Sequence, residues 1–185
     1  MLDFIAITDH NETSFARALQ TQLGSQIIVG EEIKTFDGEI IGLYLTRTIE
    51  KGKSALDTVR EIHAQGGLVY IPHPFETGRA GLQENILERI KDEIDILEVF
   101  NARGRFRGKN DQAASFSKNK NFVLASSSDS HCLKGVGSAY SIVDQKPTKE
   151  SLVELLKTAE LRKEYAPLIS FLCPSINKIK NKLFL

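Results

Sequence analysis

The sequence is poor in cysteine and carries no net charge, and each of these features excludes a class of protein. Its 185 residues include two cysteines, Cys132 and Cys173. Two cysteines this far apart indicate neither a disulfide framework nor a zinc ribbon, so we expect a protein of the reduced cytoplasm. The 24 lysines and arginines balance 24 aspartates and glutamates, so no overall field favours nucleic acid or an anionic membrane. We expect neither a membrane nor a specific double-stranded nucleic acid as a partner.

Long apolar runs are also missing. No stretch approaches the roughly 20 apolar residues that cross a bilayer, and the N-terminal segment has Asp3 where a signal peptide carries lysine or arginine. Residues 2–8 are instead typical of a buried strand. There is no internal repeat, low-complexity segment or interdomain linker, and a hydrophobic content of 41% suffices for the core of one domain.

Strand-like and helix-like segments alternate along the chain, which favours a parallel α/β sheet or barrel. The apolar patterns predict strands over residues 2–8, 26–29, 68–71, 96–100, 122–125 and 139–143. They predict helices over residues 12–23, 54–65, 82–94, 110–120 and 147–161. Asp37-Gly38 suits a tight turn, so residues 33–36 and 39–45 are expected to form a hairpin.

Two helix starts carry capping signals. Asn11 is placed to cap the first predicted helix, whose inward face would hold Phe15, Ala18 and Leu19. Ser54 with Asp57 is typical of a capping box at the start of the second.

Four of the expected strands end on residues that bind metal ions. The ends are Thr8-Asp9-His10, Gly30-Glu31-Glu32, Pro72-His73-Pro74 and Ser128-Asp129-Ser130-His131. Parallel strands covered by helices bring such ends to one rim. Imidazoles and carboxylates together suit zinc, manganese or iron. Such ions lower the pKa of bound water and hold a phosphoryl oxygen, as phosphoester hydrolysis near neutral pH requires, and Glu32 would be the natural bridge between two of them.

Each of these residues also has an ordinary structural explanation. A histidine beside a proline, such as His73, is commonly a satisfied core or surface group, and Asp9 is another candidate cap for the following helix. The recurrence of the pattern favours a metal site, because three of the four histidines lie at strand ends. The fourth, His63, lies inside a predicted helix and is expected to be structural.

The ordered motifs resemble the PHP (polymerase and histidinol phosphatase) superfamily of metal-dependent phosphoesterases. Residues 7–11 (ITDHN) resemble its second motif, residues 30–32 (GEE) its Gly-x-Glu element, residues 71–75 (IPHPF) its third motif and residues 128–131 (SDSH) its last. Residues 98–101 (EVFN) resemble the strand between the last two motifs. The resemblance covers residues 1–157, including a C-terminal associated region, and leaves residues 158–185 as a helical tail.

The resemblance implies an α/β fold with a distorted (β/α)7-type barrel and two or three divalent ions at its C-terminal rim. It implies five metal ligands, which are His10, Glu32, His73, Asp129 and His131. Members normally open with Asp-x-His-x-His, which this sequence lacks. We therefore expect a barrel incomplete at the N-terminus, with the first strand and helix absent, and manganese, zinc or iron at incomplete occupancy. An exposed strand edge would favour a homo-oligomer.

Basic residues near these motifs are candidates for binding a phosphate. Arg79 follows His73 closely, and its guanidinium is suited to grip a phosphate bidentately. Arg103 and Arg105 belong to a basic stretch with Arg107 and Lys109, which is either a phosphate clamp or a solvated loop. Residues 174–185 predict a short helix that covers its own domain, docks a partner or lies on a membrane.

Two functions from different classes fit the sequence. The first is a metal-dependent phosphoesterase that hydrolyses a phosphate monoester or nucleotide-like phosphodiester through metal-activated water. In it, Arg79 or Arg103 steadies the phosphoryl group, and His131 or His10 moves protons. The second is a truncated, catalytically silent binding module with a partial metal site. A small phosphorylated compound or nucleotide is the expected ligand in the first case.

Overall fold

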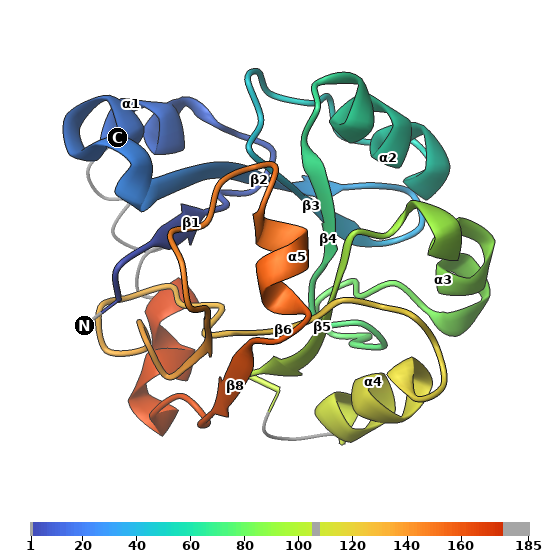
Figure 1. Ribbon diagram of the computed structural model, residues 1–185. Coiled ribbons are helices and arrows are strands. Elements are labelled where there is room, and N and C mark those ends of the chain that lie inside the picture. The colour runs from blue at the N-terminus through green and yellow to red at the C-terminus, as the bar shows by residue number, and fades with distance from the viewer. Residues whose placement is uncertain (1, 105–107, 176–185) are drawn as a thin grey trace.

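The structure is a computed structural model that describes residues 2–104 and 108–175. It is a mixed α/β fold in which helices cover a curled, half-barrel sheet (Figure 1). The sheet contains, in chain order, β1 (Ile5–Ile7), β2 (Ile27–Lys34), β3 (Glu39–Leu43), β4 (Leu68–Ile71), β5 (Ile96–Asn101) and β6 (Leu124–Ser127). A separate ribbon pairs β7 (Ala139–Ile142) with β8 (Glu160–Lys163).

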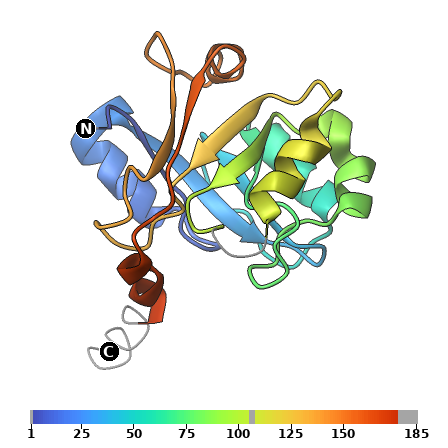
Figure 2. The same cartoon turned by 90° about the horizontal axis from the view of Figure 1, so that it is seen from below.

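The helices lie on both sides of the sheet. They are α1 (Ser14–Leu23), α2 (Ala55–Ala64), α3 (Glu84–Ile90), α4 (Lys109–Ser117) and α5 (Leu152–Leu156), with short 3₁₀ turns η1 (Gly24–Gln26), η2 (Lys91–Glu93) and η3 (Leu168–Leu172). Figure 2 shows α5 at one end of β8 and η3 beyond the other. Within the described residues, no helix is both long enough and apolar enough to cross a bilayer.

The sheet is mixed rather than all parallel. β1 is parallel to β2, and β4, β5 and β6 are parallel to one another, but β3 runs antiparallel to both β2 and β4. The cause is the predicted hairpin, which is confirmed: the turn at Asp37-Gly38 sets Lys34 opposite Glu39. The parallel arrangement expected from the alternating pattern is therefore wrong at β3.

Side chains alternate between two apolar layers on opposite faces of the sheet. Ile33 and Ile40 pack in a cluster with side chains of α2, α3 and α4, among them Val59 and Leu87. The other cluster holds Ile28, Ile41, Leu43 and Ile96 together with Leu152 and Leu156 of α5. Because both faces are covered, the strand ends at one rim are the places where polar side chains gather.

Local signals predicted some helix boundaries and missed others. Ser54 caps α2, because its Oγ accepts a hydrogen bond from the Asp57 backbone N–H at 3.1 Å. The expected cap of α1 is wrong: the helix begins at Ser14, and Asn11 Oδ1 instead accepts a hydrogen bond from the Lys34 backbone N–H at 2.9 Å. The N-cap residue is Thr13, which makes no side-chain capping bond, and the Glu12 carboxylate before it accepts a hydrogen bond from the Ser14 backbone N–H.

Two further expectations about the helices are wrong. The first concerns the inward face of α1, which was expected to hold Phe15. Phe15 is 56% exposed, and the buried residue of the helix is Ala16. The helix expected over residues 147–161 is reduced to α5, because residues 160–163 pair with β7 as β8. Arg105 and Arg107 of the basic stretch, and residues 176–185 of the expected tail helix, lie outside the described residues.

Candidate metal centre

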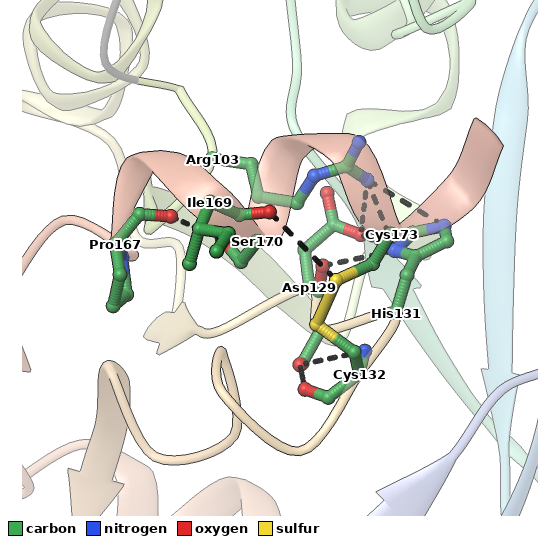
Figure 3. The surroundings of a disulfide bond; sticks show 9 residues. Arg103, Asp129, His131, Cys132, Pro167, Ile169, Ser170 and Cys173 are labelled. Atoms are coloured by element: carbon green, nitrogen blue, oxygen red, sulfur yellow. Dashed lines mark hydrogen bonds and ion pairs between the residues drawn. A yellow bond between two sulfur atoms is a disulfide. The ribbon is translucent and has the colours of Figure 1, made fainter. Parts of the chain in front are cut away.

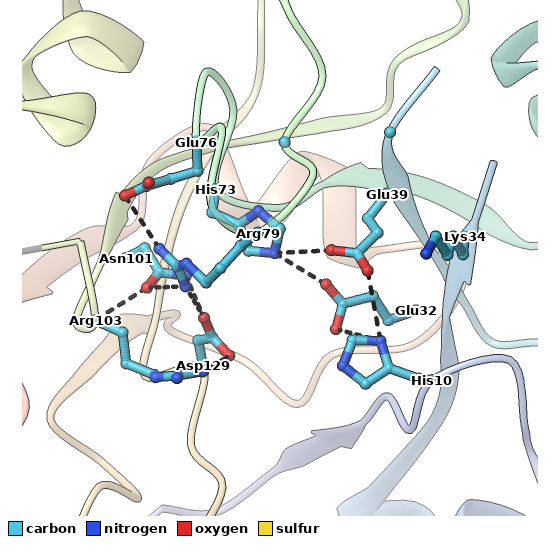
Figure 4. A network of polar contacts seen from close by, with 12 residues as sticks. His10, Glu32, Lys34, Glu39, His73, Glu76, Arg79, Asn101, Arg103 and Asp129 are labelled. Carbon is cyan, nitrogen blue, oxygen red and sulfur yellow. Dashed lines mark hydrogen bonds and ion pairs between the residues drawn. The ribbon is translucent and has the colours of Figure 1, made fainter. Parts of the chain in front are cut away.

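Eight polar side chains line one pocket of about 240 Å³ at the rim of the sheet. Figure 4 labels all of them except His131. They include every ligand that the sequence predicted and two of the predicted phosphate-binding arginines: His10, Glu32, Glu39, His73, Arg79, Arg103, Asp129 and His131. His10 and His131, 121 positions apart in the sequence, therefore line the same pocket. The roles of these residues as metal ligands stay predictions. His63 lies elsewhere and contacts Asp95 at 3.0 Å.

The pairing of β1 with β2 continues past the strands and places His10 beside Glu32. The two residues form an isolated parallel bridge, and the Asn11 backbone N–H donates to the Glu32 carbonyl at 3.0 Å. Gly30 permits this close approach, because a Cβ there would lie 2.8 Å from the Thr8 methyl group. The imidazole of His10 is 53% exposed and lies at the open side of the pocket.

Glu39 is a pocket residue that the sequence analysis missed. It pairs with Lys34 across the hairpin, so it lies on the same face of the sheet as Glu32. The signal was present, because the Asp37-Gly38 turn fixes this register. The ligand atoms of His10, Glu32 and Glu39 all lie within 4.8 Å of one another.

The two carboxylates lie between two imidazoles (Figure 4). His10 Nδ1 is 3.5 Å from Glu32 Oε2 and 3.7 Å from Glu39 Oε1. From the other side, His73 Nε2 is 2.9 Å from Glu32 Oε1 and 3.8 Å from Glu39 Oε2. This set of nitrogen and oxygen donors is typical of a zinc, manganese or iron site.

His73 is held in an unusual backbone conformation just after β4. Its φ is +30°, outside the favoured regions for a non-glycine residue, and such strain is concentrated at functional sites. Its backbone N–H donates to Glu98 Oε1 at 2.8 Å. Gly81 packs so tightly on the His73 carbonyl that a Cβ there would lie 2.3 Å from the oxygen. The imidazole is therefore fixed in place, with its Nδ1 buried and without a hydrogen-bond partner.

The electrostatics of this half of the pocket favour a cation. Burial raises the pKa of Glu39, and the neighbouring charge of Glu32 raises it further. Burial lowers the pKa of His73, but its hydrogen bond to Glu32 and the charge of that carboxylate outweigh burial, so the pKa is raised overall. Burial is thus the main cause of the Glu39 shift, and the Glu32 carboxylate contributes to both shifts. Among the described residues, neither carboxylate forms an ion pair with a lysine or arginine.

The other half of the pocket holds Asp129 and His131 with two guanidinium groups. Arg79 Nη1 forms an ion pair with Asp129 Oδ2, and Arg103 Nη1 lies 3.4 Å from Asp129 Oδ1. Arg103 Nη1 also lies 3.0 Å from His131 Nδ1. Asp129 has a positive φ of 45°, so this turn too carries backbone strain.

Glu98 is a second residue that the sequence analysis did not place in the site. Its fully buried carboxylate accepts hydrogen bonds from the His73 backbone N–H, Asn101 Nδ2, Tyr70 Oη and Ser127 Oγ. Burial raises its pKa, and His73 and the hydrogen bonds act in the opposite direction. Glu98 thus ties β4, β5 and β6 together directly beneath the pocket.

The two cysteines are paired, a bond that the sequence did not indicate. Cys132 and Cys173 form a disulfide with their Cα atoms 6.0 Å apart (Figure 3). It fastens the chain after η3 to the loop that carries His131. The Arg103 guanidinium lies 6.0 Å from the centre of the Phe171 ring on the same segment. The pairing spans 41 positions, so no local sequence pattern could have indicated it.

Comparison with known proteins finds one matching family and two archaeal relatives. Residues 107–161 match the family described as PHP-associated. An uncharacterized protein from Methanocaldococcus jannaschii is 33% identical over 183 residues, which are 96% of this chain and 71% of that protein. Another from the same organism is 38% identical over 107 residues, which are 56% of this chain and 61% of that protein.

A solved structure shares the fold. A two-domain protein from Bacteroides vulgatus that contains a predicted PHP-like metal-dependent phosphoesterase has a TM-score of 0.66 and 17% identity. The match covers 88% of this chain and 56% of that one. This chain therefore spans less than two thirds of that protein and of the second archaeal relative.

Proposed function

Because this chain belongs to the PHP superfamily, we propose that it is a metal-dependent phosphoesterase acting on a phosphate monoester or nucleotide-like phosphodiester. One observation carries the proposal: a single pocket combines two carboxylates set between imidazoles with two guanidinium groups. The first set suits a metal ion, and the second suits the phosphoryl oxygens of a substrate.

The donor set fits a divalent cation such as manganese, zinc or iron. His10, Glu32, Glu39 and His73 would hold it, and the fit rests on their nitrogen and oxygen donors and on two carboxylates whose ion-pair partners, among the described residues, are imidazoles. When bound, such an ion lowers the pKa of water and neutralises phosphoryl charge. Glu98 would keep the His73 backbone in place for this task.

Arg103 is the residue that supports phosphate binding most directly. Its side chain is largely buried, and its Nε is buried without a hydrogen-bond partner. A guanidinium that lines the pocket, with an Nε–H group lacking a partner, is suited to donate to a phosphoryl oxygen. Arg79 would add positive charge from the side of Asp129.

Two histidines are suited to moving protons. His131 Nδ1 lies 3.0 Å from Arg103 Nη1 and 3.2 Å from the Asp129 carbonyl oxygen, so the imidazole is held at the pocket between these two groups. His10 is half exposed beside the carboxylates, where it can exchange protons with solvent. We assign them the roles of proton donor or acceptor to the reacting oxygens.

The proposal also covers the complete barrel and the number of subunits. The curled sheet would be part of a distorted (β/α)7-type barrel. Among the described residues β1 pairs with β2 on one side only, and an open strand edge favours pairing with another copy of the chain. Light scattering coupled to size exclusion would give the mass: a dimer or larger supports this arrangement, and a monomer at all concentrations rejects it.

The activity is tested with p-nitrophenyl phosphate and its bis-ester in the presence of manganese, zinc or iron. We expect metal-dependent hydrolysis of at least one ester, removal of that activity by a chelator, and a loss of at least about 100-fold in His73→Ala. His63→Ala is the matched control, because His63 lies outside the pocket. Equal activity in the two variants would remove His73 from the site.

A second candidate is a catalytically silent binding module. The observation that favours it is the engagement of Asp129 by two arginines, which leaves fewer groups for a multi-ion centre. Protein that retains a metal ion and binds phosphate but hydrolyses neither ester would support the module over the enzyme.

A further inference from the structure

Arg79 is surrounded by acceptors rather than directed at open space. Its Nη1 pairs with Asp129 and donates to Asn101 Oδ1 at 3.1 Å, while its Nη2 lies 3.4 Å from Glu76 Oε1. The side chain is 22% exposed. Asn101 is itself fixed, because its Nδ2 donates to Glu98 Oε1 at 2.8 Å and to Asp129 Oδ2 at 3.2 Å. The Arg79 guanidinium is therefore fixed in the pocket by contacts with Asp129, Asn101 and Glu76.

The pocket consequently divides into two halves of different charge. Glu32 and Glu39 bring two negative charges when ionised, and the ion-pair partners shown for them are the imidazoles of His10 and His73. In the other half, the charges of Arg79 and Arg103 balance those of Asp129 and Glu76. A divalent cation is attracted to the first half, whereas near Asp129 it would face two resident positive charges.

We propose that the guanidinium of Arg79 is the resident counter-cation of Asp129 and takes the place of a second metal ion. The chain then holds one ion, bound through Glu32, Glu39, His10 and His73, and Asp129 acts as a positioning residue for Arg79 and Arg103. This inference rests on the proposed function and reassigns Asp129, which the sequence predicted as a metal ligand. The fixed positive charges would meet phosphoryl oxygens without depending on a second ion.

Two isosteric variants test which half of the pocket binds the metal ion. Glu39→Gln and Asp129→Asn each remove one carboxylate charge from the same pocket. We would measure manganese binding to the full chain by titration calorimetry and by metal analysis after dialysis. The expected results are about one ion per chain in the unaltered protein, at least a tenfold weaker affinity in Glu39→Gln, and a change of less than about threefold in Asp129→Asn.

The ion pair itself has a test that needs no metal. In excess chelator, Arg79→Met and Asp129→Asn should each lower the melting temperature, and the loss in the double variant should be smaller than the sum of the two single losses, because the Arg79–Asp129 pair can be lost only once. Some further loss is expected when Asp129→Asn is added to Arg79→Met, because Asp129 also contacts Arg103 and Asn101. Additive losses in this cycle would overturn the inference.

Metal binding distinguishes this inference from the function that it extends. Two or more ions per chain, or an Asp129→Asn variant that loses manganese as severely as Glu39→Gln, would overturn the inference and leave a metal-dependent phosphoesterase standing. Protein that binds no ion at all would overturn both.

Discussion

The disulfide between Cys132 and Cys173 gives the most direct prediction about stability. Replacing Cys173 with serine removes a link between residues separated by 41 positions. For a closed loop of that length, the entropy lost by the unfolded chain corresponds to about 4 kcal/mol at 25 °C. Both cysteines are only partly buried, so the smaller, more polar serine creates little cavity. We therefore expect Cys173→Ser to lower the free energy of unfolding by roughly 3–4 kcal/mol.

The assay is urea unfolding followed by circular dichroism, with chelator present so that metal binding does not contribute. The oxidised protein should lose the same amount of stability when a dithiol reductant is added, whereas Cys173→Ser should not respond to reductant. A variant with both cysteines replaced by serine is the control for the thiols themselves. Equal stability of oxidised and reduced protein, or two titratable thiols in protein purified without reductant, would refute the reasoning.

Further changes test burial, the polar network and the core. Burial raises the pKa of Glu31 to about 7 from an ordinary value of 4.5, so the folded state holds the proton more tightly than the unfolded state and stability falls as pH rises between these values. This loss, about 3 kcal/mol in total, should disappear in Glu31→Gln when urea unfolding is repeated from pH 4.5 to 8 in chelator, and an equal pH dependence in the variant would contradict it. Glu98→Ala leaves several buried donors without an acceptor and should cost roughly 3 kcal/mol or more in urea unfolding, against less than about 1 kcal/mol for the exposed Glu154→Ala. Ile62→Ala should cost about 2–4 kcal/mol by the same measurement because the side chain is fully buried, whereas Leu133→Ala, at a position 91% exposed, should change stability by less than about 0.5 kcal/mol.

The features that the sequence predicted well are those with local physical causes. The Asp37-Gly38 hairpin and the Ser54 cap depend on residues within a few positions of one another, and both are confirmed. The convergence of His10, His73, Asp129 and His131 in one pocket follows from a second general rule, that strand ends meet at one rim. Glu32 joins them from inside β2, which continues to Lys34 beyond the predicted end of the strand.

The features that were missed depend on contacts between distant segments. Residues 160 and 161 end the predicted helical pattern, but residues 160–163 pair with β7 and form a strand. The face of α1 is selected by packing at Ala16 and by a 2.8 Å hydrogen bond between Thr13 and Thr48, which the spacing of apolar residues does not contain. The ion pair of Arg79 with Asp129, 50 positions away, is likewise a contact that no local pattern contains, while the role of Arg79 in phosphate binding stays a prediction.

Glu39 is a different case, because its position could have been predicted. Once the hairpin register is fixed, residues 32, 34, 39 and 41 share one face of the sheet, and two of them are glutamates. The hairpin register alone therefore predicts Glu39 beside Glu32, as a fourth donor next to His10, Glu32 and His73.

Anomalous diffraction from crystals grown with manganese would locate the ion directly. The account predicts one strong peak within coordination distance of Glu32, Glu39, His10 and His73, and no second peak at Asp129. A peak bound through Asp129 and His131, or no peak in the pocket at saturating manganese, would contradict it.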